Sequence, residues 1–125
     1  MRPTLTVLVM LARLLGVIQI VTGLAFWMGL LSKATPVHIA LGSLLVLVLW
    51  TVALTALFAL PARMVPLVAL FWGGAVLWLG MAQTTLLPGS AHWAVRIAHL
   101  VVGVAALGLI ESLAKATKRH WSAAH

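Results

Sequence analysis

Four long apolar stretches, with short polar breaks between them, make up nearly all of this chain of 125 residues. They lie at about residues 3–31, 36–60, 64–87 and 91–116, and each is long enough to cross the roughly 30 Å hydrocarbon core of a bilayer as a helix. Hydrophobic residues form 64% of the chain and charged residues only 7%, which is too few to cover the surface of a soluble domain. The sequence therefore predicts an all-α integral membrane protein, with residues 1–125 as one domain.

The breaks between the stretches predict how the helices are arranged. Because short loops join successive helices, neighbouring helices should run antiparallel, in an up-down-up-down four-helix bundle. Two of the breaks contain helix start signals: Thr35 is the expected N-cap before Pro36, and Ser90 is the expected N-cap of the last helix.

The basic residues predict the orientation of the bundle. One end collects Arg2, Arg63, Lys115, Lys118 and Arg119, whereas the other end has Lys33 and, near its surface, Arg96. Because basic residues are retained on the cytoplasmic side, both termini should be cytoplasmic, and we expect a multi-pass protein of the bacterial cytoplasmic (inner) membrane. The formal charge of +7 comes from single residues at the ends of apolar stretches, which is typical of contact with anionic lipid and argues against nucleic acid as a partner.

Two short motifs recur in the same order in the two halves of the chain. Gly-x-x-Gln occurs at residues 16–19 and 80–83, and His-x-x-x-Gly occurs at residues 38–42 and 99–103. The order predicts two related helical hairpins, with the two histidines of the second motif at matching depth on diagonal helices. Counting from the helix starts would instead place His92 level with the first of them, so the repeat also predicts that the last helix protrudes outward by about two turns.

A histidine inside a membrane helix is costly unless it has a partner, so His38 and His99 are candidate functional residues. Two inward-facing imidazoles on different helices can supply both axial ligands of a haem iron. Gly42 and Gly103 each lie one turn beyond a histidine on the same helix face, where a missing side chain would leave room for the macrocycle.

A haem also carries two propionates, which need cations or water. Arg96 lies three residues before His99, on the same face and slightly further out, and is the candidate partner for them. His92 and Lys33 are expected to assist it at the outer surface.

Through its two His-x-x-x-Gly motifs the chain resembles small bacterial four-helix membrane cytochromes of b type. The larger members of that class hold two haems with four histidines in two layers, whereas the inner half of this chain has only the tail residues His120 and His125. The resemblance therefore implies one haem b. The layout is also similar to DoxX-type four-helix membrane proteins, through Arg13-Leu-Leu-Gly16 in the first helix.

These features predict an electron-transfer protein rather than an enzyme in its own right, because no nucleophile–base pair, phosphate loop or paired carboxylates are present. It would pass single electrons between the quinol pool, or a neighbouring subunit, and an acceptor on the outer side. A second reading is a cofactor-free accessory or scaffold subunit of a larger respiratory or photosynthetic complex. A third is a copper or zinc site formed by His38, His92 and His99. An oligomer remains open.

Glu111 is the only acidic residue, and it falls inside the last apolar stretch. A carboxylate there should find a cation, and Arg13 in the first stretch lies at similar depth. We expect an Arg13–Glu111 ion pair between the first and last helices. Gln19 and Gln83 should hydrogen-bond between helices.

Overall fold

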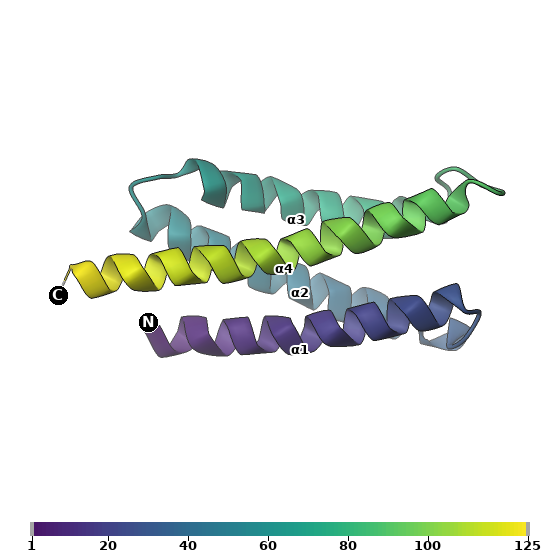
Figure 1. Cartoon of the computed structure of the whole chain (residues 1–125), viewed down its shortest axis with the longest axis horizontal. Helices are drawn as coiled ribbons and strands as arrows, with labels where there is room; N and C mark the ends of the chain where they lie inside the picture. Colours follow the sequence, from purple (N-terminus) through teal and green to yellow (C-terminus); the bar gives the residue numbers. More distant parts are fainter. Residues whose placement is uncertain (1, 125) are drawn as a thin grey trace.

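In a computed structural model, which describes residues 2–124, the chain forms four long α-helices and one short 3-10 helix, with no strand in that range (Figure 1). The elements are α1 (Arg2–Trp27), η1 (Ser32–Ala34), α2 (Thr35–Ala59), α3 (Met64–Ala82) and α4 (His92–Ala123). All four α-helices are long and apolar enough to cross a membrane. The predicted all-α four-helix bundle is confirmed.

The two hairpins, α1–α2 and α3–α4, pack side by side with both ends of the described chain at the same end of the bundle (Figure 1). The helices α2 and α4 each pack against all three other helices, whereas α1 and α3 lie on opposite sides of them. The helices that carry His38 and His99 are therefore the two central ones.

The helix ends differ from the sequence prediction at three places. Helix α1 ends at Trp27 rather than near residue 31, because Gly29 and Leu31 have positive φ of 77° and 59° and cannot continue a helix. Helix α3 ends at Ala82 rather than near residue 87, and Leu87 also has a positive φ of 44°. Helix α4 continues to Ala123, well past residue 116, and His125 lies outside the described residues.

The two predicted N-caps are wrong. Ala34 stands at the N-cap of α2, because the Thr35 hydroxyl donates at 2.8 Å to the carbonyl of Ser32 in the short helix η1 instead of capping α2. Ala91 rather than Ser90 stands at the N-cap of α4, and no side chain caps it. Pro36 does occupy the first turn of α2, as expected.

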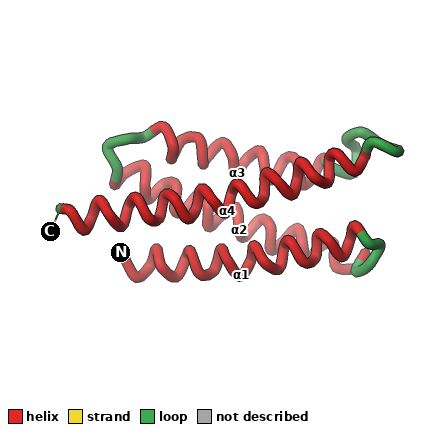
Figure 2. The backbone as a smooth tube through the Cα atoms, in the orientation of Figure 1, coloured by secondary structure: helices red, strands yellow, loops and turns green. Residues whose placement is uncertain are grey.

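The best-shielded side chains gather toward the end of the bundle that carries the termini. On α2 the buried residues run from Leu45 to Ala56, and on α4 they run from Ala106 to Thr117, with only Val95 buried nearer the other end. Figure 2 shows that α1 and α4 diverge toward the end of the bundle that carries η1 and the α3–α4 loop. Packing is therefore tightest in the terminal half and looser in the half that contains both candidate histidines.

A row of polar contacts joins α1 to α4 in the terminal half. As the chain advances along α1, each partner on α4 moves back by nearly the same number of residues, which is the register of an antiparallel pair. The contacts are Arg2 NH2 to the Trp121 carbonyl at 2.7 Å, Lys118 Nζ to Thr6 Oγ1 at 2.8 Å, and Arg13 to Glu111.

The Arg13–Glu111 pair is bidentate, with Nε donating to Oε1 at 2.6 Å and NH2 donating to Oε2 at 3.0 Å. This two-point geometry fixes both planar groups. The predicted ion pair between the first and last helices is confirmed. Its side chains are 65% and 42% exposed in the isolated chain, so the pair lies on the outer surface of the α1–α4 seam.

Two indole rings tie neighbouring helices together elsewhere. Trp50 Nε1 on α2 donates to the carbonyl of Leu70 on α3 at 3.0 Å, and Trp72 Nε1 on α3 donates to the carbonyl of Val102 on α4 at 2.9 Å. The indole of Trp50 lies directly on Gly73, which has no side chain to obstruct it. Both tryptophans therefore serve as packing residues.

Candidate functional site

His38 lies in the first turns of α2 and is held from α1 by three residues. Its Nδ1 is 2.6 Å from the Thr22 hydroxyl oxygen, and its ring meets the Phe26 ring edge-on, with centroids 5.1 Å apart. Gly23 faces the ring, since a Cβ at that position would lie 3.7 Å from Cε1. The imidazole is half-buried and fixed in orientation.

The surroundings of Thr22 assign the tautomer of His38. The single hydroxyl proton can go to the carbonyl of Ile18, at 2.8 Å, or to that of Gln19, at 3.3 Å, or to the imidazole. Most hydrogen bonds form when the hydroxyl donates to Ile18 and accepts from Nδ1–H of His38. We assign that arrangement, which leaves Nε2 with a free lone pair, the state in which an imidazole binds a metal.

His99 lies in the first half of α4, toward the end of the bundle opposite the termini, and packs against Gly80 of α3. A Cβ at position 80 would come within 3.1 Å of the His99 Cε1, so any larger residue there would displace the ring. The ring is half-buried, and its Nδ1 is shielded from solvent with no hydrogen-bond partner among the described residues. A shielded polar atom of this kind costs free energy unless something binds it.

The two imidazoles come from the two central helices of the bundle, α2 and α4. Each belongs to the second helix of a hairpin and packs on a glycine of the first helix, Gly23 for His38 and Gly80 for His99. In the repeat Gly80 corresponds to Gly16 rather than to Gly23, so the two histidines pack on different positions of the preceding helices.

The two Gly-x-x-Gln motifs also make different contacts in the two hairpins. Gly16 packs against Leu107 of α4, with 2.5 Å between the position of an added Cβ and Leu107 Cδ1, whereas Gly80 packs against His99. Gln19 lies in the middle of α1, whereas Gln83 is the C-cap of α3. Gly16 and Gly80 therefore make room for different side chains, Leu107 and His99.

The two glycines of the His-x-x-x-Gly motifs also differ. Gly103 has no atom within 4 Å of an added Cβ although it is only partly exposed, so its face of α4 has room. Gly42 does not, because the Gln19 amide fills that space and its Nε2 would lie 2.7 Å from an added Cβ. The same Nε2 donates to the carbonyl of His38 at 2.7 Å, which confirms the interhelix bond predicted for Gln19, while Gln19 Oε1 is shielded and without a partner.

The remaining predicted site residues lie near the end of the bundle opposite the termini. Arg96 and Lys33 are exposed. His92 is half-buried and its Nδ1 lies 3.2 Å from the carbonyl of Leu86, so it closes the α3–α4 turn. Within residues 2–124 no three side chains of the types His, Cys, Asp and Glu lie close enough together to hold a metal ion, so His38, His92 and His99 do not form a three-imidazole site.

Three features around the two histidines are compatible with haem ligation. One imidazole has its Nδ1 engaged and its Nε2 free, a second has a shielded nitrogen without a partner, and Gly103 leaves room beside the second. Two neutral imidazole nitrogens are a ligand set that haem iron takes, whereas zinc sites use three or four protein ligands. The Gln19 amide, which occupies the Gly42 face, opposes the predicted arrangement.

Sequence reasoning missed Thr22 and the pairing of each histidine with a glycine on the preceding helix. Thr22 lies one helical turn beyond Ile18, to whose carbonyl it bonds, and is adjacent to Gly23. The Thr-Gly pair in an apolar helix was the available signal, because it brings a hydroxyl and a gap to adjacent positions.

No family model, no curated protein and no solved structure matches this chain.

Proposed function

We propose that this chain is a multi-pass protein of the cytoplasmic membrane of a bacterium, with both termini cytoplasmic, that binds one haem b between His38 and His99. A bound haem supplies a single-electron redox centre, and the protein then passes electrons between a quinol or neighbouring subunit and an acceptor on the outer side. The observation that carries the proposal is the Thr22–His38 contact of 2.6 Å, which orients the imidazole and leaves Nε2 available.

The side chains divide the work of holding such a group. Thr22 and Phe26 fix the ring plane of His38, since one bonds Nδ1 and the other meets the ring edge-on. Gly80 lets the ring of His99 lie against α3, and the His99 Nδ1 has no hydrogen-bond partner among the described residues. Exposed Arg96, one turn before His99, would pair with anionic substituents at the outer surface.

Absorption spectroscopy tests the proposal. The purified full chain, titrated with haem in mild detergent, should bind one equivalent and show the reduced α and Soret bands of a low-spin b haem. His38→Ala and His99→Ala should each abolish low-spin binding, whereas His92→Ala, a matched change on the same helix as His99, should retain it. A spectrum that stays that of free haem at stoichiometric addition would refute the proposal.

Thr22→Val provides a finer test of the assigned tautomer. It removes the hydroxyl but keeps the shape of the side chain, so low-spin ligation should survive while haem affinity falls by about 10–100-fold, as for other losses of a group that orients a metal-ligating histidine. Unchanged affinity would show that the Thr22 contact does not prepare His38 for iron.

The second candidate function is a cofactor-free accessory subunit of a larger membrane complex. The Arg13–Glu111 pair favours it, because an ion pair exposed on the surface of apolar helices needs a cover other than lipid tails. On this reading Thr22 merely satisfies His38, and His38→Ala should leave folding and assembly unaffected. The absorption spectrum in the haem titration separates the haem protein from the cofactor-free subunit.

A further inference from the structure

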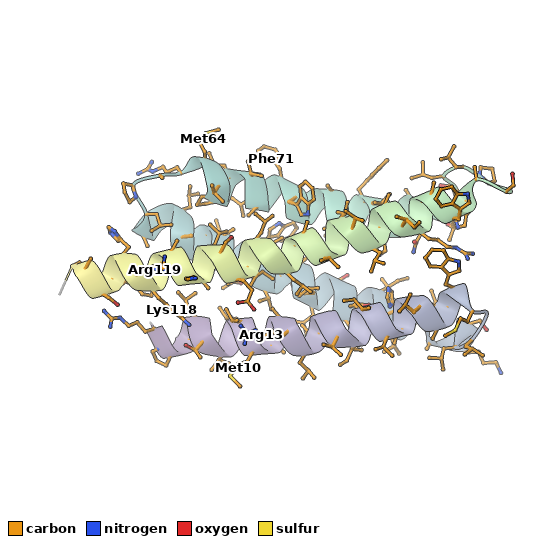
Figure 3. The ribbon with its side chains drawn as sticks, in the orientation of Figure 1. Met10, Arg13, Met64, Phe71, Lys118 and Arg119 are labelled. Atoms are coloured by element: carbon orange, nitrogen blue, oxygen red, sulfur yellow. The ribbon has the colours of Figure 1, made fainter. Side chains whose placement is uncertain are left out.

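A basic groove runs along the α1–α4 seam, at the end of the bundle opposite His38 and His99. It has a volume of about 680 Å³, which is within the range of roughly 300–1,000 Å³ typical of ligand sites. We call it the α1–α4 groove, and its lining on the two helices is Thr6, Val9, Met10, Arg13, Glu111, Ala114, Lys115, Lys118, Arg119, Ser122 and Ala123. In Figure 3 Arg13 and Lys118 lie in the strip between the two helices, with Arg119 beside them.

The groove carries cations that the chain cannot neutralise. Glu111 is the only acidic side chain in the protein, and both its oxygens are taken by Arg13. The groove therefore holds one carboxylate against the four cations Arg13, Lys115, Lys118 and Arg119, which leaves it with a net positive charge. Lys118 gives one ammonium proton to Thr6 Oγ1, which holds it over the groove with two protons left for a ligand.

The shape of the groove matches a molecule that is anionic at one end and apolar at the other. Apart from Arg13, its cations lie near the end of α4, and its floor is apolar, formed by the buried side chains Val9 and Ala114. From Met10 an exposed apolar stripe continues along the same face of α1 through Leu14, Val17 and Val21. A headgroup over the cations would place its acyl chains along this stripe.

We infer that the α1–α4 groove is a binding site for the phosphate headgroup of an anionic phospholipid. Basic pockets between membrane helices at the cytoplasmic side bind such headgroups, and each Lys or Arg near the surface contributes about a fivefold preference for anionic lipid. The lipid also supplies the cover that the exposed Arg13–Glu111 pair requires. The inference does not depend on haem, since the groove and the histidines are at opposite ends of the bundle.

The first experiment compares lipid preference between charge variants of the full chain. Lys115→Gln with Arg119→Gln removes two groove charges, while Lys33→Gln with Arg63→Gln removes two exposed charges outside the groove. Native mass spectrometry in neutral detergent should show that the preference for phosphatidylglycerol over phosphatidylcholine falls about 25-fold in the groove variant and is unchanged in the control. Equal losses in both variants would reduce the preference to net charge and overturn the site.

The second experiment locates the lipid without removing any charge. The chain has no cysteine, so Met10→Cys in the groove and Phe71→Cys on the outer face of α3 each give one labelling position (Figure 3). Both positions are exposed and lie about two helical turns from the start of their helix. Brominated phosphatidylglycerol should quench a fluorophore at position 10 more strongly than brominated phosphatidylcholine does, with no difference at position 71.

Inorganic phosphate distinguishes a headgroup from a soluble anion. At millimolar concentration it should leave the selective quenching at position 10 intact, because the apolar stripe contributes to lipid binding. Equal quenching by the two brominated lipids at position 10, or full displacement by inorganic phosphate, would overturn the lipid assignment.

Discussion

Two adjacent glycines on α3 provide a direct test of the packing described above. Gly73 is buried, and a Cβ added there would overlap Nε1 of Trp50 and lie 2.9 Å from Cδ1 of the same ring. Gly74 is exposed, and an added Cβ would have no neighbour within 4 Å. Gly73→Ala and Gly74→Ala therefore make the same chemical change in the same helix, with and without a steric conflict.

The expected cost of Gly73→Ala follows from the contacts that it disturbs. Displacing the Trp50 ring incurs about 1–3 kcal/mol of overpacking, and losing its bond to the Leu70 carbonyl costs about 0.6–1.7 kcal/mol in a membrane protein. Replacing a mid-helix glycine by alanine offsets about 1 kcal/mol of this. We expect a net loss of about 1–4 kcal/mol for Gly73→Ala, and a gain of up to about 1 kcal/mol for Gly74→Ala.

Unfolding of the full chain by sodium dodecyl sulfate in mixed micelles measures both values. Circular dichroism should follow the transition, with tryptophan fluorescence, to which all six tryptophans contribute, as a second probe. If Gly73→Ala were as stable as Gly74→Ala, the ring of Trp50 would not lie on Gly73, and the α2–α3 packing described here would be incorrect.

Two further predictions concern the polar contacts between helices. Gln19→Leu should destabilise the bundle by at most about 1 kcal/mol in the same unfolding assay, because it removes the unpartnered Oε1 together with the bond to the His38 carbonyl; a loss of several kcal/mol would contradict this. Arg13→Gln and Glu111→Gln should each destabilise the bundle, and the double variant should lose less than the two single losses combined, because the bidentate pair is broken only once. A strictly additive cycle in reconstituted bilayers would show that the two side chains do not interact.

The arrangement of the helices was predictable because it depends on length and hydropathy. Four apolar stretches with short breaks leave little choice but an antiparallel bundle. The helix ends were less accessible, since Leu31 and Leu87 adopt positive φ values that leucine rarely takes and that no residue pattern announces. Thr35 and Ser90 are good N-cap residues by type, but a neighbouring turn positioned the backbone differently.

The ion pair was predictable for a different reason. A chain with one acidic side chain inside an apolar stretch has few ways to satisfy it, and counting residues from the helix ends left Arg13 as the cation at matching depth. The inference was strong because the chain has only one acidic side chain to pair. That the pair lies on the surface was not accessible, because two apolar helices do not reveal which of their faces is turned outward.

The surroundings of the histidines required the coordinates. The spacing His-x-x-x-Gly correctly places each glycine on its histidine's face of the helix, but it cannot say what approaches from a neighbour. At Gly42 the approaching group is the Gln19 amide, and at Gly103 no atom approaches. Small differences in the rotation of α1 and α3 decide such contacts, and those rotations are set by the packing of all four helices together.

The uneven distribution of the core bears on both of the proposed sites. Between Leu45 and Ala56, and between Ala106 and Thr117, α2 and α4 carry nearly all of their buried side chains, so packing contributes most to stability in that half. The histidine half is then free to keep shielded polar atoms without partners, a cost that a chain stabilised only there could not tolerate. The same tight half holds α1 and α4 in fixed register, and this register aligns Lys118 with Thr6 and leaves the neighbouring cations facing outward, where the anionic lipid is proposed to bind.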